Sequence, residues 1–475
     1  MNLDVYNTHM ELYPYVKGDY PIIEKQYTAT DKFTGNDFPC GYMIEDGKLY
    51  LPKGTSISWV ESLTGATIND KFDSDPMDEM TKKHYSLYDP RNKIQEESIA
   101  FLKENNHQGA LNLQTGGGKT FCVAYAASDL MIKTIIITPN ESLKLQWLNT
   151  FSKMFEYKTK NLMNIAGSNI INGIMDDLIE YEDTDVFFVN HQTLQSYITN
   201  NNGFMLHKFF KKIKVGIKVY DESHMNFANI INIDSFTNTD RTWYLTATFD
   251  RSDKSESKCF KRAFNSVISY GEIESKEIMR KHVIYHIIDI NSRVTPKNRA
   301  KVIGYTGFTS ISYGKYAFFE DPNDTAYKTI LELLKKTKDT EGKTLVFVPL
   351  IDAVDEVVIK LKKDFLDKSV GAYHSKISKD EKESSLKKDI IVSTIKSCGT
   401  GKDIPGLRCV ICAEPIASKI IAQQLMGRLR PYADDKDTYF FDIKDVSFNV
   451  NTWWWNSRMK VYQDLAKKVV YLNID

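Results

Sequence analysis

The chain has 475 residues, and its 62 Lys and Arg balance its 62 Asp and Glu, so it carries no formal net charge. This balance excludes a globally basic nucleic-acid binder, and any nucleic-acid site must be a local patch. Hydrophobic content of 42% and charged content of 26% are typical of soluble globular proteins. No segment has the apolar length of a membrane span or the pattern of a signal peptide, so we expect a cytoplasmic protein with no membrane association.

The six cysteines are scattered along the chain, and only Cys409 and Cys412 have a spacing that suggests a shared metal. They lie in an apolar run that predicts a buried strand. Residues three apart on a strand point to opposite faces of the sheet, so one ion could not bind both. We therefore expect free, buried thiols, as in an intracellular protein.

Residues 1–85 differ in sequence pattern from the rest of the chain. Short strand-like runs at 41–44 and 48–52 are separated by Asp-Gly and Pro-Lys-Gly turns. This pattern predicts a small accessory domain of mixed α+β type, which could bind DNA.

From residue 89 onward, apolar strands alternate with amphipathic helices, as expected for parallel strands buried on both faces. We expect a first lobe at 86–290, a linker or insertion at 291–325 and a second lobe with a C-terminal helix at 326–475. The strand at 283–290 is expected to leave the first sheet, and residues 325–335 have helical periodicity. The other predicted strands are 110–114, 134–138, 186–190, 217–220, 242–245, 344–348, 389–394, 409–412 and 439–443.

A glycine-rich loop follows the first of these strands. Gly116, Gly117 and Gly118 precede Lys119 and Thr120, and an alanine-rich helix follows them. Glycines let successive N–H groups point at one anion, and the helix presents its N-terminal N–H groups to the same anion. The lysine can reach the β- and γ-phosphates, and the threonine hydroxyl can bind Mg²⁺. The loop therefore predicts a nucleoside triphosphate site. The usual pattern begins with a glycine, and this chain has a leucine at that position.

An acidic pair, Asp221 and Glu222, ends the strand at 217–220 about a hundred residues later. Carboxylates at the C-terminal edge of a parallel strand lie where α/β proteins bind ligands. Asp221 can hold Mg²⁺ through water, and Glu222 can orient and deprotonate the attacking water.

The sequence from Asp221 to His224 resembles the DExH box of superfamily 2 helicases and translocases. Other segments follow in that family's order, and the resemblance covers about residues 86–450. The matching segments are 138–147 (motif Ia), 190–193 (motif Ic), 245–248 (the Ser/Thr-Ala-Thr motif), 345–349 (motif IV), 393–394 with 401–405 (motif V) and 424–430 (motif VI). The family's fold class is α/β, with two tandem RecA-like parallel-sheet lobes and a nucleotide cleft between them.

The resemblance assigns roles residue by residue. The implied catalytic residues are Lys119, Asp221, Glu222, His224, Arg428 and Arg430. The implied ATP-binding residues are Gln95, Thr115, Gly116, Gly117, Gly118, Lys119, Thr120, Gly401, Asp403 and Gln424. The implied Mg²⁺ residues are Thr120 and Asp221. The implied nucleic-acid contacts are Thr138, Pro139, Asn140, Thr193, Thr246, Thr248, Val348 and Thr394. Their hydroxyls, amide and N–H groups suit phosphates, which implies sequence-independent, salt-sensitive binding.

Two positions depart from the family's pattern. Gln95 matches the glutamine that reads adenine, but its spacing from Arg91 is unusual. The second arginine of motif VI normally falls where this chain has Pro431, so either Arg428 or Arg430 could be the arginine finger.

The resemblance implies a monomeric ATP-dependent helicase or translocase that uses Mg²⁺. It is similar to viral DNA helicases, namely phage UvsW-type branch-migration and fork-reversal enzymes and the poxvirus transcript-release helicase. These imply action on branched, forked or single-stranded DNA with 3′-to-5′ polarity, in replication, recombination or repair. An RNA helicase, a translocase that displaces a stalled polymerase and an inert scaffold with a decayed ATPase fold stay open as alternatives.

Three further features are open to two interpretations. Two basic clusters fit either a phosphate track or a solvated helix face: Lys208, Lys211, Lys212 and Lys214 in one, and Lys254, Lys258, Lys261 and Arg262 in the other. The run of tryptophans at 453–455 could stack on bases, but its apolar stripe favours a closing helix that packs on the second lobe.

Overall fold

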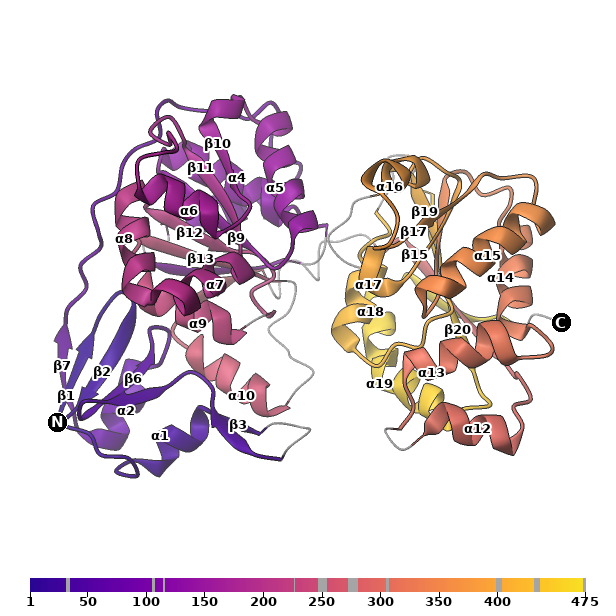
Figure 1. Cartoon of the computed structure of the whole chain (residues 1–475), viewed down its shortest axis with the longest axis horizontal. Helices are drawn as coiled ribbons and strands as arrows, with labels where there is room; N and C mark the ends of the chain where they lie inside the picture. The colour runs from indigo at the N-terminus through magenta and orange to yellow at the C-terminus, as the bar shows by residue number, and fades with distance from the viewer. Residues whose placement is uncertain are drawn as a thin grey trace. The chain divides into compact units, whose positions relative to one another are not determined.

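The computed structural model describes residues 1–30, 35–104, 107–113, 116–225, 227–246, 254–271, 281–304, 307–398, 404–430 and 436–472. The chain forms two compact units, Met1–Ile278 and Met279–Asp475, which are drawn in Figure 1. The first unit contains a small N-terminal domain and a parallel-sheet lobe, and the second unit contains another parallel-sheet lobe.

The N-terminal domain is built on a five-stranded mixed sheet in the order β5-β6-β2-β1-β7. Its strands are β1 (Asn2–Val5), β2 (His9–Tyr13), β5 (Met43–Glu45), β6 (Lys48–Pro52) and β7 (Thr67–Asp70). Its other elements are helices α1 (Pro21–Gln26) and α2 (Ile57–Thr64) and the paired strands β3 (Thr28–Thr30) and β4 (Asp37–Pro39). β1 pairs with β7 in parallel and with β2 antiparallel, so the predicted α+β domain is confirmed.

The first lobe has a seven-stranded sheet in the order β10-β11-β9-β12-β13-β8-β14, in which all strands are parallel. Its strands are β8 (Gln108–Asn112), β9 (Thr134–Thr138), β10 (Leu162–Ile165), β11 (Val186–Asn190), β12 (Ile217–Tyr220), β13 (Arg241–Thr246) and β14 (Ile268–Tyr270). Its helices are α3 (Lys93–Glu104), α4 (Lys119–Leu130), α5 (Glu141–Met154), η1 (Thr159–Asn161), α6 (Ser168–Met175), α7 (His191–Asn201), α8 (Gly203–Ile213), α9 (Phe227–Phe236) and α10 (Lys254–Ala263).

Alternate residues of each strand in this lobe face two separate cores. On β9, Ile136 packs with α3, α4 and α5, whereas Ile135 and Ile137 pack with α6 to α9. Burial on both faces explains why these strands read as continuous apolar runs in the sequence.

The core of the N-terminal domain extends into the first lobe. Phe227 of α9 and Cys259, Phe260 and Ala263 of α10 are buried together with residues of the N-terminal sheet. Figure 1 shows α10 beside β3 of this domain. The N-terminal domain and the first lobe therefore share one hydrophobic cluster.

The second lobe has a seven-stranded parallel sheet in the order β17-β18-β16-β19-β20-β15-β21. Its strands are β15 (Val283–Ile290), β16 (Lys343–Phe347), β17 (Val370–Tyr373), β18 (Ile390–Ser393), β19 (Leu407–Cys412), β20 (Thr438–Asp445) and β21 (Lys468–Tyr471). Its helices are α12 (Pro296–Ile303), α13 (Ser310–Lys315), η2 (Tyr316–Glu320), α14 (Thr325–Lys336), α15 (Ile351–Asp364), α16 (Lys379–Ser385), α17 (Ile395–Cys398), α18 (Lys419–Met426) and α19 (Asn449–Leu465). The fold class of two parallel-sheet lobes with a small N-terminal domain is confirmed.

β15, the strand that the sequence predicts to leave the first sheet, belongs to the sheet of the second lobe. It pairs along its whole length with β20 and also with β21. Its apolar pattern predicts a strand equally well in either place, because the choice of partner depends on contacts far apart in the chain.

The tryptophan run lies on α19, and most of it packs as predicted. Trp455 is 5% exposed, and Trp454 packs on the lobe's core, whereas Trp453 is 66% exposed. Cys409 and Cys412 of β19 are buried in different clusters on the two faces of the sheet, which confirms their predicted orientation. Among the described residues, no helix is long and apolar enough to cross a membrane.

Candidate ATP site and nucleic-acid contacts

The glycine-rich loop lies between β8 and α4 in the first lobe. Gly116 and Gly118 have φ of +92° and +91°, and Gly118 is the N-cap residue of α4. Side chains disfavour this left-handed region, so glycine lets the loop direct backbone N–H groups toward the start of the helix. The described part of the loop therefore fits a phosphate group. Thr115 lies outside the described residues.

Gln95 packs against this loop from α3. Its Nε2 donates a 3.3 Å hydrogen bond to the carbonyl of Gly117, and its Oε1 accepts from the N–H of Arg91 at 2.8 Å. A Cβ on Gly118 would overlap Nε2 of Gln95. Gln95 is only 1% exposed, so its amide supports the loop that we expect to hold the phosphates.

Lys119 and Thr120 occupy the first turn of α4. Nζ of Lys119 donates a 2.7 Å hydrogen bond to the carbonyl of Leu113, at the other end of the same loop. The lysine side chain thus folds back over the loop.

The acidic pair follows β12, as predicted. Asp221 is 6% exposed; its Oδ1 accepts from the N–H of Glu222 at 2.9 Å, and its Oδ2 accepts from Nε1 of Trp147 at 2.8 Å. Burial and then the charge of Glu222 raise the pKa of Asp221 to about 6. The hydrogen bond from Trp147 and the charge of Lys119 act in the opposite direction. Glu222 has φ of +48°, a strained value for a residue with a side chain and one that recurs at functional sites.

The donor set here fits Mg²⁺. This ion takes one or two carboxylates together with phosphates and water, and Thr120 and Asp221 could supply the protein's share. The described residues contain no group of three or more His, Cys, Asp or Glu placed to hold a metal. A magnesium ion would therefore depend on the nucleotide for the rest of its ligands.

His224 connects the acidic pair to the next motif. Its Nδ1 is hydrogen-bonded to Oγ1 of Thr246 at 3.1 Å and lies 3.4 Å from Oε2 of Glu222. The backbone N–H of Ser223 also donates to the carbonyl of Leu245 at 2.8 Å. The DExH segment and the end of β13 are therefore joined through both side chain and backbone. Thr248 lies outside the described residues.

Motifs Ia and Ic meet at the carboxyl ends of β9 and β11. The hydroxyl of Thr138 donates to Oδ1 of Asn190 at 2.9 Å, and Nδ2 of Asn190 donates to Glu141 at 3.0 Å. Asn140 caps α5 by accepting from the N–H of Leu143. These bonds bring two of the predicted nucleic-acid segments together at one edge of the sheet.

Pro139 and Thr193 belong to the same two segments. Pro139 precedes the cap of α5, and Thr193 lies in the first turn of α7; both are partly exposed. They are accordingly accessible at the edge where Asn140 lies.

In the second lobe, Thr394 and Val348 follow neighbouring strands. The hydroxyl of Thr394 donates to Oγ of Ser397 at 2.9 Å. Val348 is fully buried, and its N–H donates to the carbonyl of Ser393 at 2.9 Å, so neither its side chain nor its N–H is directed at a ligand.

Motif VI spans the end of α18 and the turn after it. Gln424 is 7% exposed on α18, whereas Arg428 and Arg430 are partly exposed beyond the helix end at Gly427. The positive charge of Arg428 acts on the hydroxyl of Tyr373, at the end of β17. The two arginines are therefore accessible at the end of α18. Gly401 and Asp403 lie outside the described residues.

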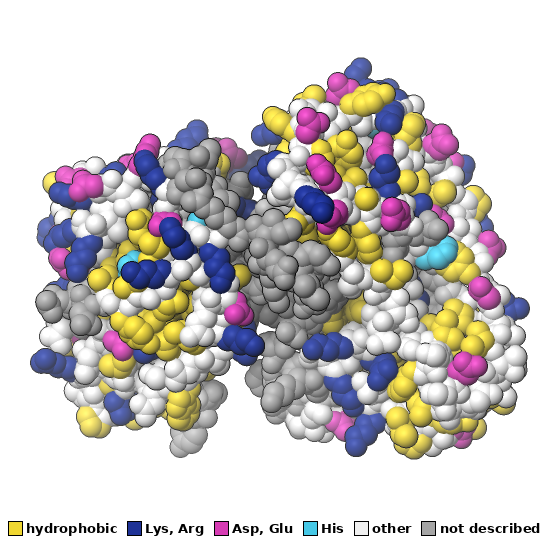
Figure 2. All heavy atoms as spheres, turned by 180° about the vertical axis from the view of Figure 1, so that it is seen from behind, with side chains coloured by type: hydrophobic (Ala, Val, Ile, Leu, Met, Phe, Trp, Pro, Cys, Tyr) yellow, Lys and Arg dark blue, Asp and Glu magenta, His cyan; other side chains and the backbone are white. Residues whose placement is uncertain are grey.

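The two basic clusters are partly used in contacts within the protein. Lys212 and Lys214 form ion pairs with Asp177 (2.6 Å) and Asp78 (3.3 Å). Arg262 lies 4.1 Å over the ring of Trp59. Figure 2 shows basic and acidic side chains interspersed over the face that it draws, as expected for a chain with no net charge.

Sequence reasoning missed two contacts at these motifs. Trp147 lies within the segment quoted for motif Ia, but its bond to Asp221 spans 74 positions. Glu414 accepts from the N–H of Ile395, next to Thr394, at 3.0 Å, and burial raises its pKa to about 7. No local pattern marks either residue.

Comparisons with known proteins agree with these motifs. Residues 84–251 match the family model described as "Type III restriction enzyme, res subunit", and residues 325–430 match the "Helicase conserved C-terminal domain". A transcript termination protein of Yaba monkey tumor virus is 22% identical over 69% of this chain. The match spans only 65% of that relative's length. "Putative helicase 161L" of Invertebrate iridescent virus 6 is 25% identical, over 81% of this chain and 82% of its own.

Solved structures share the fold. Dbp5 of S. cerevisiae, bound to RNA and ADP BeF3, has a TM-score of 0.56 with 15% identity, over 80% of this chain and 89% of its own. A fragment of a type I restriction enzyme HsdR subunit from Vibrio vulnificus has a TM-score of 0.54 with 16% identity, over 82% of this chain and 70% of its own. At these identities the likeness concerns the fold alone.

Proposed function

Because this chain belongs to the superfamily 2 helicases, we propose that it is an ATP-driven nucleic-acid helicase that acts on branched or forked DNA with 3′-to-5′ polarity. The observation that carries the proposed mechanism is the hydrogen bond between His224 and Thr246. It joins the segment that would sense the γ-phosphate to the motif that follows β13. Hydrolysis can therefore change the structure of a segment that the family uses for coupling.

The candidate residues for ATP hydrolysis have distinct roles in this mechanism. Lys119 and the glycine loop bind the phosphates, Thr120 and Asp221 hold Mg²⁺, and Glu222 takes the proton of the attacking water. When bound, Mg²⁺ would neutralise the developing charge on the phosphates. Arg428, with Arg430 as the alternative, is the proposed always-charged planar donor for phosphoryl transfer.

The nucleic-acid grip is proposed to involve Thr138, Pro139, Asn140 and Thr193 in the first lobe and Thr394 in the second. Their positions at strand ends and helix caps suit phosphates rather than base edges, so binding should be independent of sequence. Two states of the lobes, with and without ATP, then grip the strand differently and move it.

The relatives favour a second candidate function. Several viral proteins similar to this chain are named transcript termination proteins. A translocase that releases a transcript from a stalled polymerase would use the same motor without separating free DNA strands.

Two measurements test the proposal. ATP turnover should be stimulated by DNA more than by a matched RNA, should be lost in Lys119→Ala and should nearly vanish in Glu222→Gln, which still binds ATP and DNA. Turnover by Glu222→Gln near the wild-type rate would refute the assignment of the base.

A panel of forks, four-way junctions and stalled transcription complexes then distinguishes the two functions. ATP-dependent unwinding or migration of the branched DNAs supports the first, and transcript release without such unwinding supports the second. Stronger stimulation by RNA than by DNA would overturn the first.

A further inference from the structure

A buried ionic cluster lies behind the acidic pair, on the opposite face of the sheet. Asp234 of α9, only 5% exposed, forms an ion pair with Lys218 at 2.6 Å and accepts hydrogen bonds from Tyr220 (2.8 Å) and Tyr244 (2.6 Å). Lys218 and Tyr220 lie on β12, which ends at the acidic pair, and Tyr244 lies on β13, which ends at Thr246. One carboxylate thus joins the two strands that lead into the catalytic and coupling motifs.

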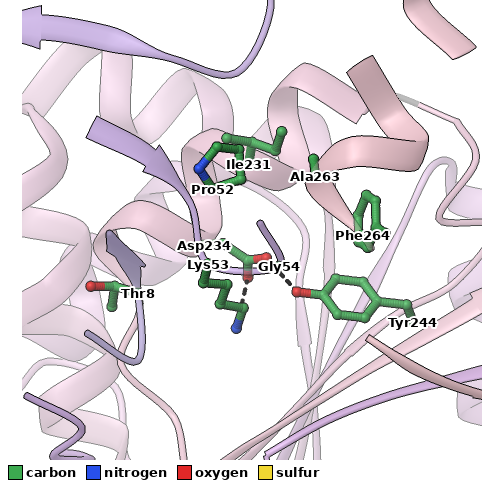
Figure 3. Close-up of a pocket in the computed structure, with 9 residues that line it drawn as sticks. All are labelled: Thr8, Pro52, Lys53, Gly54, Ile231, Asp234, Tyr244, Ala263 and Phe264. Atoms are coloured by element: carbon green, nitrogen blue, oxygen red, sulfur yellow. Dashed lines mark hydrogen bonds and ion pairs between the residues drawn. The ribbon is translucent and has the colours of Figure 1, made fainter. Parts of the chain in front are cut away.

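The N-terminal domain contributes a second lysine to this cluster. Lys53 follows β6, and its side chain is 5% exposed. Its Nζ donates to Oγ1 of Thr242 on β13 at 2.9 Å and lies 3.7 Å from Oδ1 of Asp234. Figure 3 shows Lys53 and Tyr244 converging on Asp234 from the N-terminal domain and from the first lobe.

The backbone around Lys53 is held firmly in place. The N–H of Ser266 donates to the carbonyl of Gly54 at 2.9 Å, and its hydroxyl donates to the carbonyl of Thr55 at 3.1 Å. A Cβ on Gly54 would overlap the carbonyl oxygen of Ala263, so this close approach requires glycine. The lysine is therefore delivered to the cluster from an anchored loop.

The charges of the cluster do not balance, because two lysines share one carboxylate. Burial lowers the pKa of Lys53 to about 7; the charge of Asp234 acts in the opposite direction, and the charge of Lys218 adds to the lowering. A buried lysine with an incomplete partner set is costly, so it is weak evidence for stability alone.

We propose that Lys53 is a positioning residue through which the N-terminal domain holds the strands that carry Asp221, Glu222 and Thr246 in the arrangement that ATP hydrolysis requires. The inference rests on the proposed ATPase mechanism. Within the described residues, Lys53 Nζ bonds to Thr242 and pairs with Asp234, so it acts through these two side chains. The N-terminal domain is thereby part of the ATPase motor rather than an appendage to it.

The variant Lys53→Met removes the amine and keeps the length of the buried side chain. We expect kcat for DNA-stimulated ATP hydrolysis to fall about 10-fold with KM for ATP changed less than about 2-fold, since nucleotide binding is untouched. Lys48→Met is the matched control. Lys48 belongs to the same domain, but its ion pair with Glu11 (2.6 Å) lies away from the cluster. Its kcat should equal that of the wild type.

A second variant keeps the inference testable if Lys53→Met does not fold. Thr242→Val removes the acceptor of the Lys53 hydrogen bond with almost no change of shape, and we expect kcat to fall about 3-fold with KM unchanged. Folded Lys53→Met with wild-type kcat would overturn the inference, as would wild-type kcat in Thr242→Val if Lys53→Met does not fold.

The ATPase mechanism and the positioning role of Lys53 can be refuted separately. If the wild type hydrolyses ATP and Lys119→Ala does not, the ATPase mechanism stands whatever the Lys53 variants do. If the wild type shows no turnover at all, the proposed mechanism fails first. Equal kcat in wild type, Lys53→Met and Thr242→Val refutes the positioning role alone.

Discussion

The indole Nε1 of Trp147 donates a 2.8 Å hydrogen bond to Oδ2 of Asp221. Trp147 is 1% exposed on α5, the helix that Asn140 caps. One end of this helix therefore carries a candidate nucleic-acid contact, and its middle contacts the carboxylate proposed to hold Mg²⁺. A displacement of α5 by a bound strand would therefore move Trp147 relative to the carboxylate of Asp221.

The variant Trp147→Phe tests this connection. It keeps an aromatic ring in the core and removes the hydrogen-bond donor, and a bond to a charged group contributes about 1.5–3 kcal/mol. We expect the stimulation of ATP hydrolysis by DNA to fall about 10-fold, with a smaller effect on hydrolysis without DNA. Steady-state ATPase assays with and without single-stranded DNA measure both.

Trp243→Phe is the control for this variant. Trp243 is fully buried in the same lobe, and its Nε1 has no hydrogen-bond partner among the described residues. The substitution therefore changes ring size without breaking a hydrogen bond. Equal stimulation by DNA in the two variants would show that the bond to Asp221 carries no coupling.

The raised pKa of Asp221 predicts how activity depends on pH. Magnesium requires the charged carboxylate, so kcat/KM should fall as the pH drops through about 6. Metal and proton compete for this group. A tenfold increase in Mg²⁺ should therefore move the fall in kcat/KM to lower pH, and a midpoint independent of Mg²⁺ would contradict the assignment.

The raised pKa of Asp221 affects stability in the opposite direction, because stability falls as the pH rises. The folded protein holds the Asp221 proton more tightly than the unfolded chain, whose ordinary pKa is 3.8, so this group favours folding less as the pH rises from about 4 to 6. Asp221→Asn should therefore abolish hydrolysis and raise the free energy of unfolding at pH 7. The gain should disappear at pH 4, where the wild-type carboxyl is protonated in the folded state. Urea unfolding at the two pH values measures it.

Local pattern was enough to predict most of the strands. The predicted bounds at 134–138, 186–190 and 217–220 agree with β9, β11 and β12, because strands buried on both faces leave unbroken apolar runs. The bond between His224 and Thr246 could also be anticipated, since both residues lie in ordered motifs at adjacent strand ends.

Contacts between distant segments could not be predicted in this way. Nothing near Lys53 in the sequence indicates that its side chain reaches Asp234, 181 positions away. The sheet to which β15 belongs could not be predicted for the same reason, since its partner β20 follows about 150 residues later. Both depend on tertiary packing, which composition and periodicity do not encode.

Gly118 should be intolerant of substitution for two separable reasons. In Gly118→Ala, the φ of +91° costs about 1–2 kcal/mol, and the new Cβ meets Gln95. We expect a raised KM for ATP together with lower stability. Gly406→Ala shares the first cost alone, because its φ is +82° and the space around it is open. It should be destabilised less than Gly118→Ala, with KM unchanged. If the clash is the cause, Gln95→Ala should cost less ATP affinity in the Gly118→Ala background than in the wild type, and equal costs would refute it.

The closing helix α19 should depend on one buried ion pair. Nη2 of Arg458 lies 2.9 Å from Oδ2 of Asp442, and both side chains are almost fully buried; Tyr285 donates to the same carboxylate at 2.6 Å. Removing one partner leaves an uncompensated buried charge. Arg458→Met should therefore lower the free energy of unfolding of the second lobe by about 3–5 kcal/mol. Lys467→Met, which breaks the more exposed pair with Asp437 (2.7 Å), should cost less than about 1 kcal/mol. Denaturant unfolding compares the two, and equal losses would mean that burial gives the Arg458 pair no special weight.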